Sequence, residues 1–226
     1  WIDNDMNFRS KTKVTAMEQH TKYNYLSYPH WNFDGSSTGH TTIDNSEVFL
    51  EPYKVYRDIF RDFNEDVVVF CNCYQKIDGE KKYFNSRNDA QKVFEEYKEL
   101  KPLFGLEQEF FIIDSKTNMP YGVDTFDSSV PHYCGVGAGN VDSRVRKFMN
   151  HVLLMAVKSG IILTGLNMEV AQGQCEFQVC NLGINACDDL VFLRYIMVRL
   201  GEDYNMKIDF TPKPYSTFNG SGCHIN

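Results

Sequence analysis

The spacing of hydrophobic and polar positions changes at about residues 76–88 of this chain. Before that stretch, short β-branched and aromatic runs alternate with turn residues. Residues 67–74 are the clearest predicted strand there, ended by the turn pair Asp78-Gly79. After it, longer helical and strand patterns follow one another. We therefore predict two domains, a small β-rich one over residues 1–80 and a larger one over residues 81–226.

The larger domain contains three segments with helical periodicity and four with strand character. Helices are predicted over residues 88–100, 142–159 and 186–204, and strands over residues 103–113, 161–170, 174–180 and 207–210. The middle helix has the strongest end signals, because Asp142 can cap its first turn and Gly160 stands at the expected C-terminal position. Helices and strands thus alternate along this part of the chain.

Composition and charge narrow the class of protein. The chain has 226 residues, a net charge of −7 and seven cysteines. It has no Lys/Arg cluster long enough to follow a nucleic acid, and its longest apolar runs are too short to span a bilayer. No secretion leader opens it, and Cys71-Asn72-Cys73 has no second pair to complete a zinc site. We expect a cytoplasmic protein with reduced thiols and with neither nucleic acid nor membrane as partner.

Glutamates recur on the predicted strands of the larger domain. Glu107 and Glu109 point to the same face of residues 103–113, because strand side chains alternate. Taken alone, this pair is equally well explained as a solvated strand face. Glu169 and Glu176 lie on the next two predicted strands, however, so four carboxylates converge if the strands share one sheet. Such a surplus of negative charge calls for a divalent cation, and oxygen ligands favour Mg²⁺ or Mn²⁺ over Zn²⁺.

His224 follows a glycine-rich stretch, residues 219–223. A single histidine is more often a structural residue than a ligand. Glycines let the backbone approach a ligand closely, however, and one imidazole added to carboxylates suits a Mg²⁺ or Mn²⁺ site.

Several blocks together resemble the glutamine synthetase family. Two of them, Trp31-Asn32-Phe33-Asp34-Gly35-Ser36-Ser37-Thr38-Gly39 and Tyr133-Cys134-Gly135-Val136-Gly137, resemble its eukaryotic-type branch. The others are Phe104-Gly105-Leu106-Glu107-Gln108-Glu109, Asn167-Met168-Glu169-Val170, Gly173-Gln174-Cys175-Glu176-Phe177-Gln178 and Asn219-Gly220-Ser221-Gly222-Cys223-His224-Ile225-Asn226. They occur in family order and span nearly the whole chain, so the set is specific although no single block is.

The resemblance implies an α+β fold, with a small β-grasp N-terminal domain before a catalytic domain whose curved antiparallel sheet is backed by helices. It also implies ATP-dependent ligation of ammonia to the γ-carboxylate of L-glutamate, through γ-glutamyl phosphate. One metal is expected at Glu109, Glu169 and Glu176, and a second at Glu107 and His224 with a glutamate from later in the chain.

The resemblance also assigns the substrate-binding residues. Asn219, Gly220 and His224 are expected at the substrate, with L-glutamate, ammonium and ATP as the substrates. Asp34, in the loop with Ser37, is expected to take a proton from ammonium across a subunit boundary. The implied assembly is a ring-shaped homo-oligomer, a decamer of two five-membered rings with active sites between adjacent subunits.

The sequence departs from the family pattern in two respects. The usual Pro-Gly-Gln-Trp-Glu is Gln172-Gly173-Gln174-Cys175-Glu176 here, and we expect Cys175 to face away from Glu176 and to affect packing. The family segments that carry phosphate-binding arginines and a closing flap follow the histidine that His224 matches. We therefore expect this chain to be the N-terminal portion of a longer polypeptide and to be inactive alone.

Two other functions stay open. One is a non-catalytic relative that acts as a metabolite sensor or assembly module, although such a protein has no chemical need for four converging carboxylates. The other is a different carboxylate–amine ligase of the same superfamily, against which the Asp34 loop argues, because an ammonium-specific pocket needs that acid.

Overall fold

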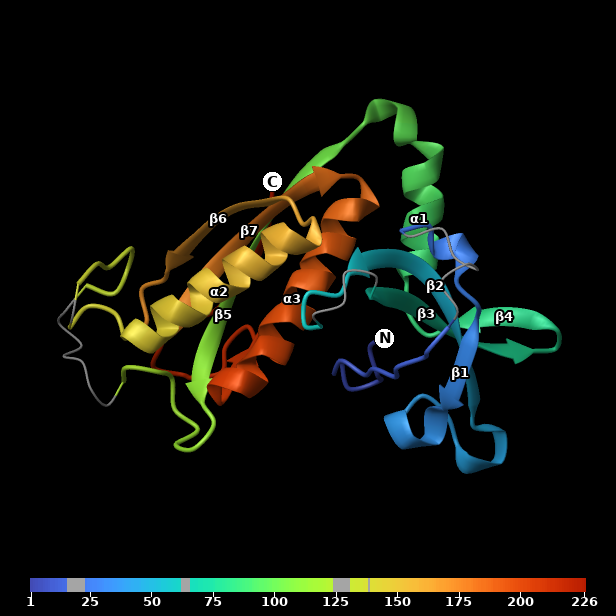
Figure 1. Cartoon of the computed structure of the whole chain (residues 1–226), viewed down its shortest axis with the longest axis horizontal. Helices are drawn as coiled ribbons and strands as arrows, with labels where there is room; N and C mark the ends of the chain where they lie inside the picture. The colour runs from blue at the N-terminus through green and yellow to red at the C-terminus, as the bar shows by residue number, and fades with distance from the viewer. Residues whose placement is uncertain (16–22, 62–65, 124–130, 138) are drawn as a thin grey trace. The chain divides into compact units, whose positions relative to one another are not determined.

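The computed structural model describes residues 1–15, 23–61, 66–123, 131–137 and 139–226 (Figure 1). These residues form two compact units, Trp1–Tyr97 and Lys98–Asn226. The domain boundary at residue 80 stays a prediction.

The N-terminal unit contains one antiparallel sheet with the strand order β1-β2-β3-β4. Its strands are β1 (Trp31–Asp34), β2 (Glu47–Arg57), β3 (Val67–Ile77) and β4 (Glu80–Tyr83). The predicted turn joins β3 to β4, where Asp78 and Gly79 have φ angles of 53° and 85°. Tight hairpin turns require such positive φ angles, which Asp and Gly tolerate best. Side chains of the strands themselves form a small core, which consists of Phe33, Val48, Leu50 and Cys73.

Helix α1 (Arg87–Glu96) follows β4 and is shorter than predicted. The expected helix over residues 88–100 ends at Glu96, and a separate 3₁₀ turn covers Lys98–Leu100. Its apolar positions have helical spacing, yet no residue of α1 is buried and Val93 is 55% exposed. Periodicity alone therefore located this helix but did not show whether its apolar face is covered.

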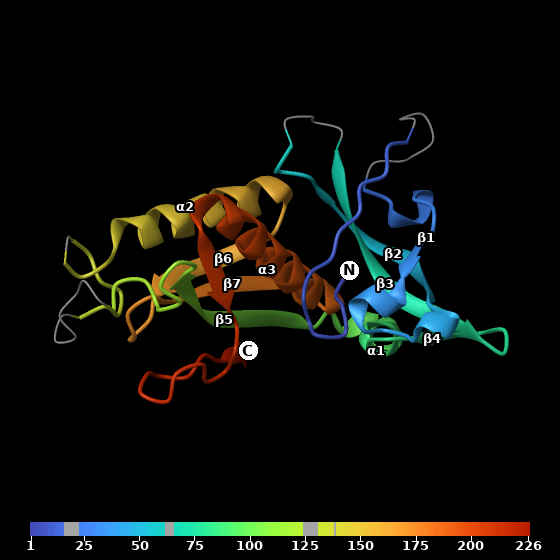
Figure 2. The same cartoon turned by 90° about the horizontal axis from the view of Figure 1, so that it is seen from below.

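The C-terminal unit is built on a second antiparallel sheet with the order β6-β7-β5-β8, and β9 also pairs with β5. The strands are β5 (Leu103–Asp114), β6 (Leu163–Met168), β7 (Gln174–Leu182), β8 (Met206–Asp209) and β9 (Cys223–Ile225). Helices α2 (Ser143–Ser159) and α3 (Ile184–Tyr204) lie along one side of this sheet, and the segment before β9 lies on the other (Figure 2). The predicted α+β class, with an antiparallel sheet backed by helices, is confirmed.

Both predicted end signals of α2 are present. The Asp142 carboxylate accepts a hydrogen bond of 2.8 Å from the Arg144 backbone N–H, and Gly160 ends the helix with a φ of 94°. The buried apolar face of α2 includes Val145, Phe148 and Met149. The side chains of this unit that are almost completely buried come from both helices and from β5 and β7; they include Phe110, Phe111, Phe148, Phe177, Phe192, Leu193 and Ile196. These buried side chains form the core of the C-terminal unit, which fixes the position of the sheet strands.

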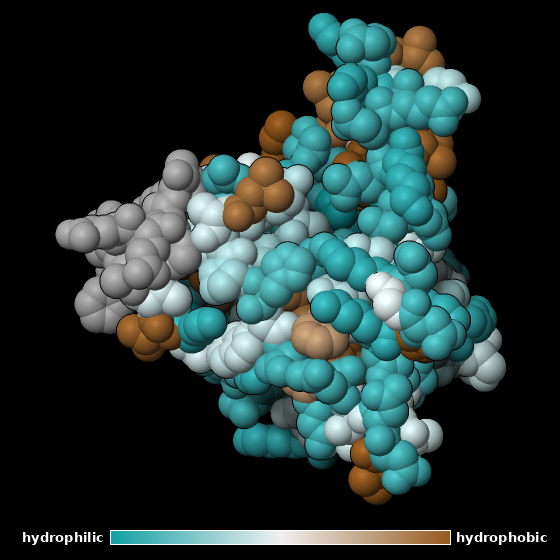
Figure 3. Space-filling model, turned by 90° about the vertical axis from the view of Figure 1, so that its right-hand side faces the viewer, coloured by the Kyte–Doolittle hydropathy of each residue, from teal (hydrophilic) through white to brown (hydrophobic). Residues whose placement is uncertain are grey.

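Hydrophobic side chains on the face drawn in the space-filling view occur in small groups among hydrophilic ones (Figure 3). Scattered apolar residues of this kind are normal on a protein surface. None of the helices in the described part of the chain has the length and apolar character needed to cross a membrane. The seven cysteines, all of which lie in that part, form no disulfide.

Candidate functional site

The site begins with the alternation of side chains along β5. Leu106, Gln108 and Phe110 are buried on the side of the helices, whereas Glu107 and Glu109 are only half-buried on the other face. Strand geometry alone produces this division, because successive residues point to opposite faces. The predicted orientation of the two glutamates is confirmed by this burial pattern.

Strand pairing adds the other two glutamates. Glu176 of β7 lies directly opposite Glu109 of β5. Glu169 is the first residue after β6, and its backbone N–H donates to the Gln174 carbonyl oxygen at 2.8 Å, which turns the chain back into β7. Three of the four carboxylates therefore lie on paired strands of one sheet. Glu169 lies just beyond β6, outside the strand that ends there at Met168 rather than at the predicted residue 170, and the turn into β7 brings it to the group.

The carboxylates form two groups whose ligand atoms lie within 4.8 Å of one another. Glu109, Glu169 and Glu176 form the first group, which matches the first expected metal site. Glu107, Glu176 and His224 form the second. His224 reaches it because β9 pairs with β5 and places His224 opposite Glu107, with Nδ1 3.4 Å from Oε2. Glu176 belongs to both groups, which the sequence analysis did not predict.

Each of the four carboxylates accepts a hydrogen bond from a side-chain amide. The distances from donor nitrogen to carboxylate oxygen run from 2.7 to 3.3 Å; the pairs are Asn226 to Glu107, Gln174 to Glu109, Asn167 to Glu169, and Gln178 to Glu176. An amide donor fixes one oxygen of a carboxylate without neutralising its charge. The other oxygen can then be offered to a cation in a fixed direction.

The electrostatics of the first group favour a cation. Burial raises the pKa of Glu169 above its usual range, and the nearby charges of Glu109 and Glu176 raise it further, although the hydrogen bond from Asn167 opposes them. Like charges this close destabilise one another unless a positive charge lies between them. Four carboxylates and one imidazole form a donor set that fits Mg²⁺ or Mn²⁺.

The glycine-rich segment borders the cluster. The Gly222 N–H donates to Oε2 of Glu109 at 3.1 Å, and the Glu109 N–H donates back to the Gly222 carbonyl oxygen at 3.0 Å. Asn219 and Gly220 are exposed just before these contacts. A Cβ at Gly220 would lie 2.9 Å from the Pro212 carbonyl oxygen, so the close backbone approach requires glycine there.

Asp34 and Ser37 lie in the N-terminal unit, where both are exposed. Asp34 caps the short 3₁₀ turn Gly35–Thr38 and accepts hydrogen bonds from the Ser36 hydroxyl at 2.6 Å and the Ser36 N–H at 3.0 Å. The Ser37 hydroxyl lies 3.4 Å from the other Asp34 oxygen. The hydroxyl of Ser36, followed by its backbone N–H, lowers the pKa of Asp34. Asp34 is therefore an anion at neutral pH.

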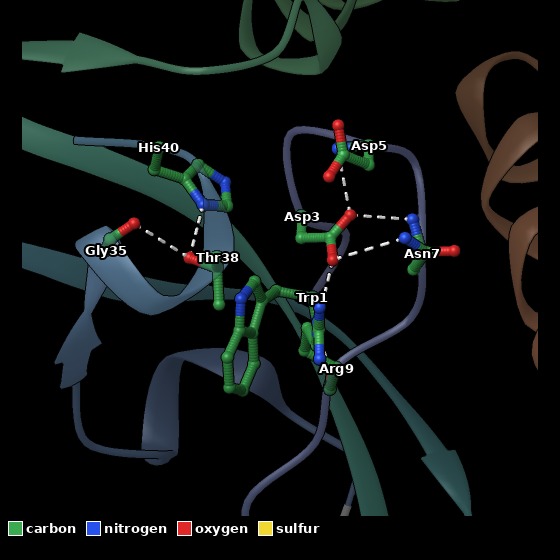
Figure 4. Close-up of polar contacts among 8 residues, drawn as sticks. All are labelled: Trp1, Asp3, Asp5, Asn7, Arg9, Gly35, Thr38 and His40. Atoms are coloured by element: carbon green, nitrogen blue, oxygen red, sulfur yellow. Dashed lines mark hydrogen bonds and ion pairs between the residues drawn. The ribbon is translucent and has the colours of Figure 1, made fainter.

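The N-terminal segment contacts this turn. Asp3 is buried and accepts hydrogen bonds from the backbone N–H groups of Asp5 and Asn7 and from Nε of Arg9 (Figure 4). The folded segment then donates from the Asn4 N–H to the Thr38 carbonyl oxygen at 3.2 Å. Asp3 thus fixes a short loop that supports the turn beginning after Asp34.

The sequence analysis did not identify the four amide donors as site residues. A signal for two of them was present, since Gln174 and Gln178 alternate with Glu176 and so share its face. Cys175 behaves as expected: it is fully buried, and its Sγ lies 3.5 Å from Sδ of Met168.

The α+β fold thus gathers four carboxylates and an imidazole into two groups whose donor atoms could hold divalent cations. A family model described as "Glutamine synthetase, catalytic domain" matches residues 84–226. The chain belongs to the glutamine synthetase family.

Whole-chain relatives agree with this assignment. The chain is 39% identical to the glutamine synthetase of Tuber borchii and 38% identical to that of Saccharomyces cerevisiae. Each match covers 100% of this chain, but 62% and 60% of the respective relative. A protein of Acanthamoeba polyphaga mimivirus is 39% identical, and 64% of its length is covered. The chain therefore spans less than two thirds of the length of these relatives.

Proposed function

We propose that this chain is part of a glutamine synthetase, which joins ammonia to the γ-carboxylate of L-glutamate at the expense of ATP, through γ-glutamyl phosphate. The observation that supports the proposal is the pair of ligand groups sharing Glu176 on one sheet face. A carboxylate is a poor electrophile, so phosphorylation by ATP is the step that makes its carbon reactive toward ammonia.

In this proposal Glu109, Glu169 and Glu176 hold one cation, and Glu107 and His224 hold a second together with Glu176. Cations held there would neutralise the charge of the phosphoryl group in transfer. The amide donors Asn167, Gln178 and Asn226 keep the carboxylates aimed inward, which spares the site a reorganisation during the reaction.

The other site residues act on L-glutamate and ammonium, the two substrates that become joined. The exposed loop with Asn219 and Gly220 receives L-glutamate, with His224 beside it. Asp34, held as an anion by Ser36 and accompanied by Ser37, takes a proton from ammonium and so produces the nucleophile. As the family resemblance implies, we propose that Asp34 acts in the site of a neighbouring subunit. The assembly is then a ring-shaped homo-oligomer, a decamer of two five-membered rings, in the cytoplasm.

Glutamine formation by the complete protein tests the proposal directly. We expect glutamine to appear only when L-glutamate, ammonium, ATP and Mg²⁺ or Mn²⁺ are all present, with one phosphate released for each glutamine. Binding of glutamate and cation without any turnover would instead identify a sensor or assembly module. Turnover with another amine but not with ammonium would identify a different carboxylate–amine ligase.

A further inference from the structure

Gln174 is the most deeply buried of the four amide donors, with 1% of its surface exposed. It is the first residue of β7 and lies on the same face as Glu176, two residues further along the strand. The β5–β7 register places it opposite Phe111, two residues from Glu109. A buried amide in this position must satisfy its hydrogen bonds within the protein.

Its nitrogen contacts three acceptors from two different parts of the chain. Nε2 of Gln174 lies 2.9 Å from the Gly220 carbonyl oxygen and 3.3 Å from both Oε2 of Glu109 and Oγ of Ser221. Oε1 accepts from the Ala171 N–H at 3.4 Å, in the turn that follows Glu169. One side chain therefore connects a candidate metal ligand, the turn after a second ligand, and the loop that precedes His224.

The loop also contacts β5 at its two ends: the Glu109 N–H donates to the Gly222 carbonyl oxygen at 3.0 Å, and the ring of Phe111 stacks on that of Phe218. The Ser221 N–H donates to the Pro212 carbonyl oxygen at 2.8 Å, which closes the loop on itself. The Gly222 N–H donates to the same Glu109 oxygen that Gln174 contacts. Glu109 Oε2 is thus shared by the loop backbone and by Gln174, so a change in the orientation of this carboxylate changes both contacts.

We propose that Gln174 is a positioning residue that couples cation binding at Glu109 to the order of loop residues 219–222. This inference rests on the proposed function, since it assumes that Glu109 binds a cation and that the loop receives L-glutamate. An amide has two hydrogens to share among three acceptors. A cation that fixes Glu109 therefore fixes the hydrogen bond from Gln174, and with it the Gly220 carbonyl and the Ser221 hydroxyl.

The test compares Gln174→Leu with Gln178→Leu in the complete protein. Each variant replaces an amide donor to a cluster carboxylate by an apolar side chain of similar size. Gln178 donates to Glu176 at 2.7 Å. Gln178→Leu therefore controls for the loss of any amide beside the cluster. Calorimetry with Mn²⁺ measures cation affinity, and hydrogen exchange of residues 220–222 with and without Mn²⁺ measures loop order.

In the unmodified protein we expect Mn²⁺ to slow exchange of the Ser221 amide about tenfold. The Gly222 N–H donates to Glu109 directly, so its exchange reports the order of that carboxylate and not the coupling through Gln174. Both variants should weaken Mn²⁺ binding about tenfold, as loss of a partner to a metal ligand typically does. Only Gln174→Leu should abolish the slowing of Ser221 exchange at saturating Mn²⁺. It should also raise KM for glutamate by a larger factor than it lowers kcat.

Slowing that persists unchanged in Gln174→Leu, or that is lost equally in Gln178→Leu, overturns the proposal. Gln174→Asn, which keeps the amide but shortens its reach, provides a second test if the leucine variant does not fold, and it should lose the slowing as well. Absence of Mn²⁺ binding in the unmodified protein would contradict the proposed function itself. If the protein binds Mn²⁺ and turns over, but loop exchange in Gln174→Leu is the same as in the unmodified protein, only the coupling is contradicted.

Discussion

Glu109 and Glu176 face each other across β5 and β7, as directly opposed residues of an antiparallel pair. Like charges in this arrangement destabilise a sheet. The structure surrounds the two carboxylates with amide donors from Gln174 and Gln178, which do not cancel their charge. A cation bound between the two carboxylates would therefore stabilise the pair.

Replacing Glu176 by Gln should weaken Mg²⁺ or Mn²⁺ binding at both ligand groups, because Glu176 belongs to each. We expect cation affinity to fall by more than the factor of about 10–100 that is typical when a residue supporting a metal ligand is replaced. Titration calorimetry on the complete protein measures it. Glu202→Gln is the matched control, since Glu202 is an exposed residue of α3 that pairs with Arg199. Unchanged affinity in the Glu176 variant would refute the assignment.

Stability without divalent cations should carry a pH signature from Glu169. Its pKa is raised in the folded state by burial and by Glu109 and Glu176, so the folded protein binds this proton more tightly than the unfolded chain. The free energy of unfolding contributed by this group therefore falls as pH rises from the ordinary glutamate range through the raised pKa. Thermal melts of the unmodified protein and of Glu169→Gln, compared at each pH, isolate that contribution. Mn²⁺ should reverse the loss at neutral pH, and identical pH dependence in the two proteins would count against the charge cluster.

Subunits with different defects should rescue one another if the active site is shared. Asp34→Ala and Glu176→Gln subunits should each be inactive alone. In mixed rings, about one interface in four joins an intact Asp34 to an intact Glu176, because each is present in half of the subunits. Glutamine formation should thus return to about a quarter of the normal rate. Mixed rings that form but stay inactive would place Asp34 and Glu176 in the same subunit's site, or Asp34 outside any site.

The 226-residue chain on its own should not make glutamine. Its relatives are longer, and the resemblance places the phosphate-binding arginines of the family in the additional length. Removal of a single donor that stabilises transition-state charge costs about 10²–10³ in rate, and several would be missing. The assay compares this chain with the complete protein at equal concentration. Activity within about tenfold of the complete protein, a barrier difference of ~1.4 kcal/mol, would show that the essential residues lie elsewhere.

Asp3→Ala should loosen the turn that follows Asp34. The variant loses the buried acceptor of Asp5, Asn7 and Arg9, which we expect to cost about 1–3 kcal/mol in the opening free energy of nearby amides. Hydrogen exchange at Asn4 and Asn7 measures this energy residue by residue. Asp5→Asn is the control, because the Asp5 side chain is exposed. Equal exchange in the two variants would argue against a supporting role for Asp3.

The pH dependence of that loop has the opposite sign to the dependence at Glu169. Burial raises the pKa of Asp3, but hydrogen bonds from Asn7 and Arg9 outweigh it and leave the pKa below its usual value. The stability that Asp3 contributes is therefore present above the ordinary aspartate pKa and is lost as pH falls through the lowered one.

Features with a strong local cause could be predicted from the sequence. Asp142 and Gly160 mark the two ends of α2 because a side-chain cap and a left-handed backbone are local requirements. The common face of Glu107 and Glu109 follows from strand alternation alone. Glu107, Glu109 and Glu176 lie on paired strands, as convergence requires, whereas Glu169 lies one residue beyond β6 and reaches the group through the turn into β7.

The features that the sequence did not predict depend on contacts between residues that are distant in sequence. β9 has only three residues and follows a glycine, so it is too short to show a strand pattern in the sequence. It forms because its backbone pairs with the free edge of β5 at residues 106–108. The membership of Glu176 in both groups is a matter of register between strands. Likewise, the exposure of Val93 in α1 could not be foreseen, because periodicity identifies the apolar side chains of a helix but not what lies against them.

The pairing of β9 with β5 also sets the order in which the site is assembled during synthesis. The group of Glu109, Glu169 and Glu176 is complete once β7 pairs with β5, when the chain has been made as far as residue 182. The group with His224 must wait for β9, a delay on the order of seconds at the usual rate of translation. If the chain holds cations as proposed, the nascent chain can therefore bind one cation before it can bind two.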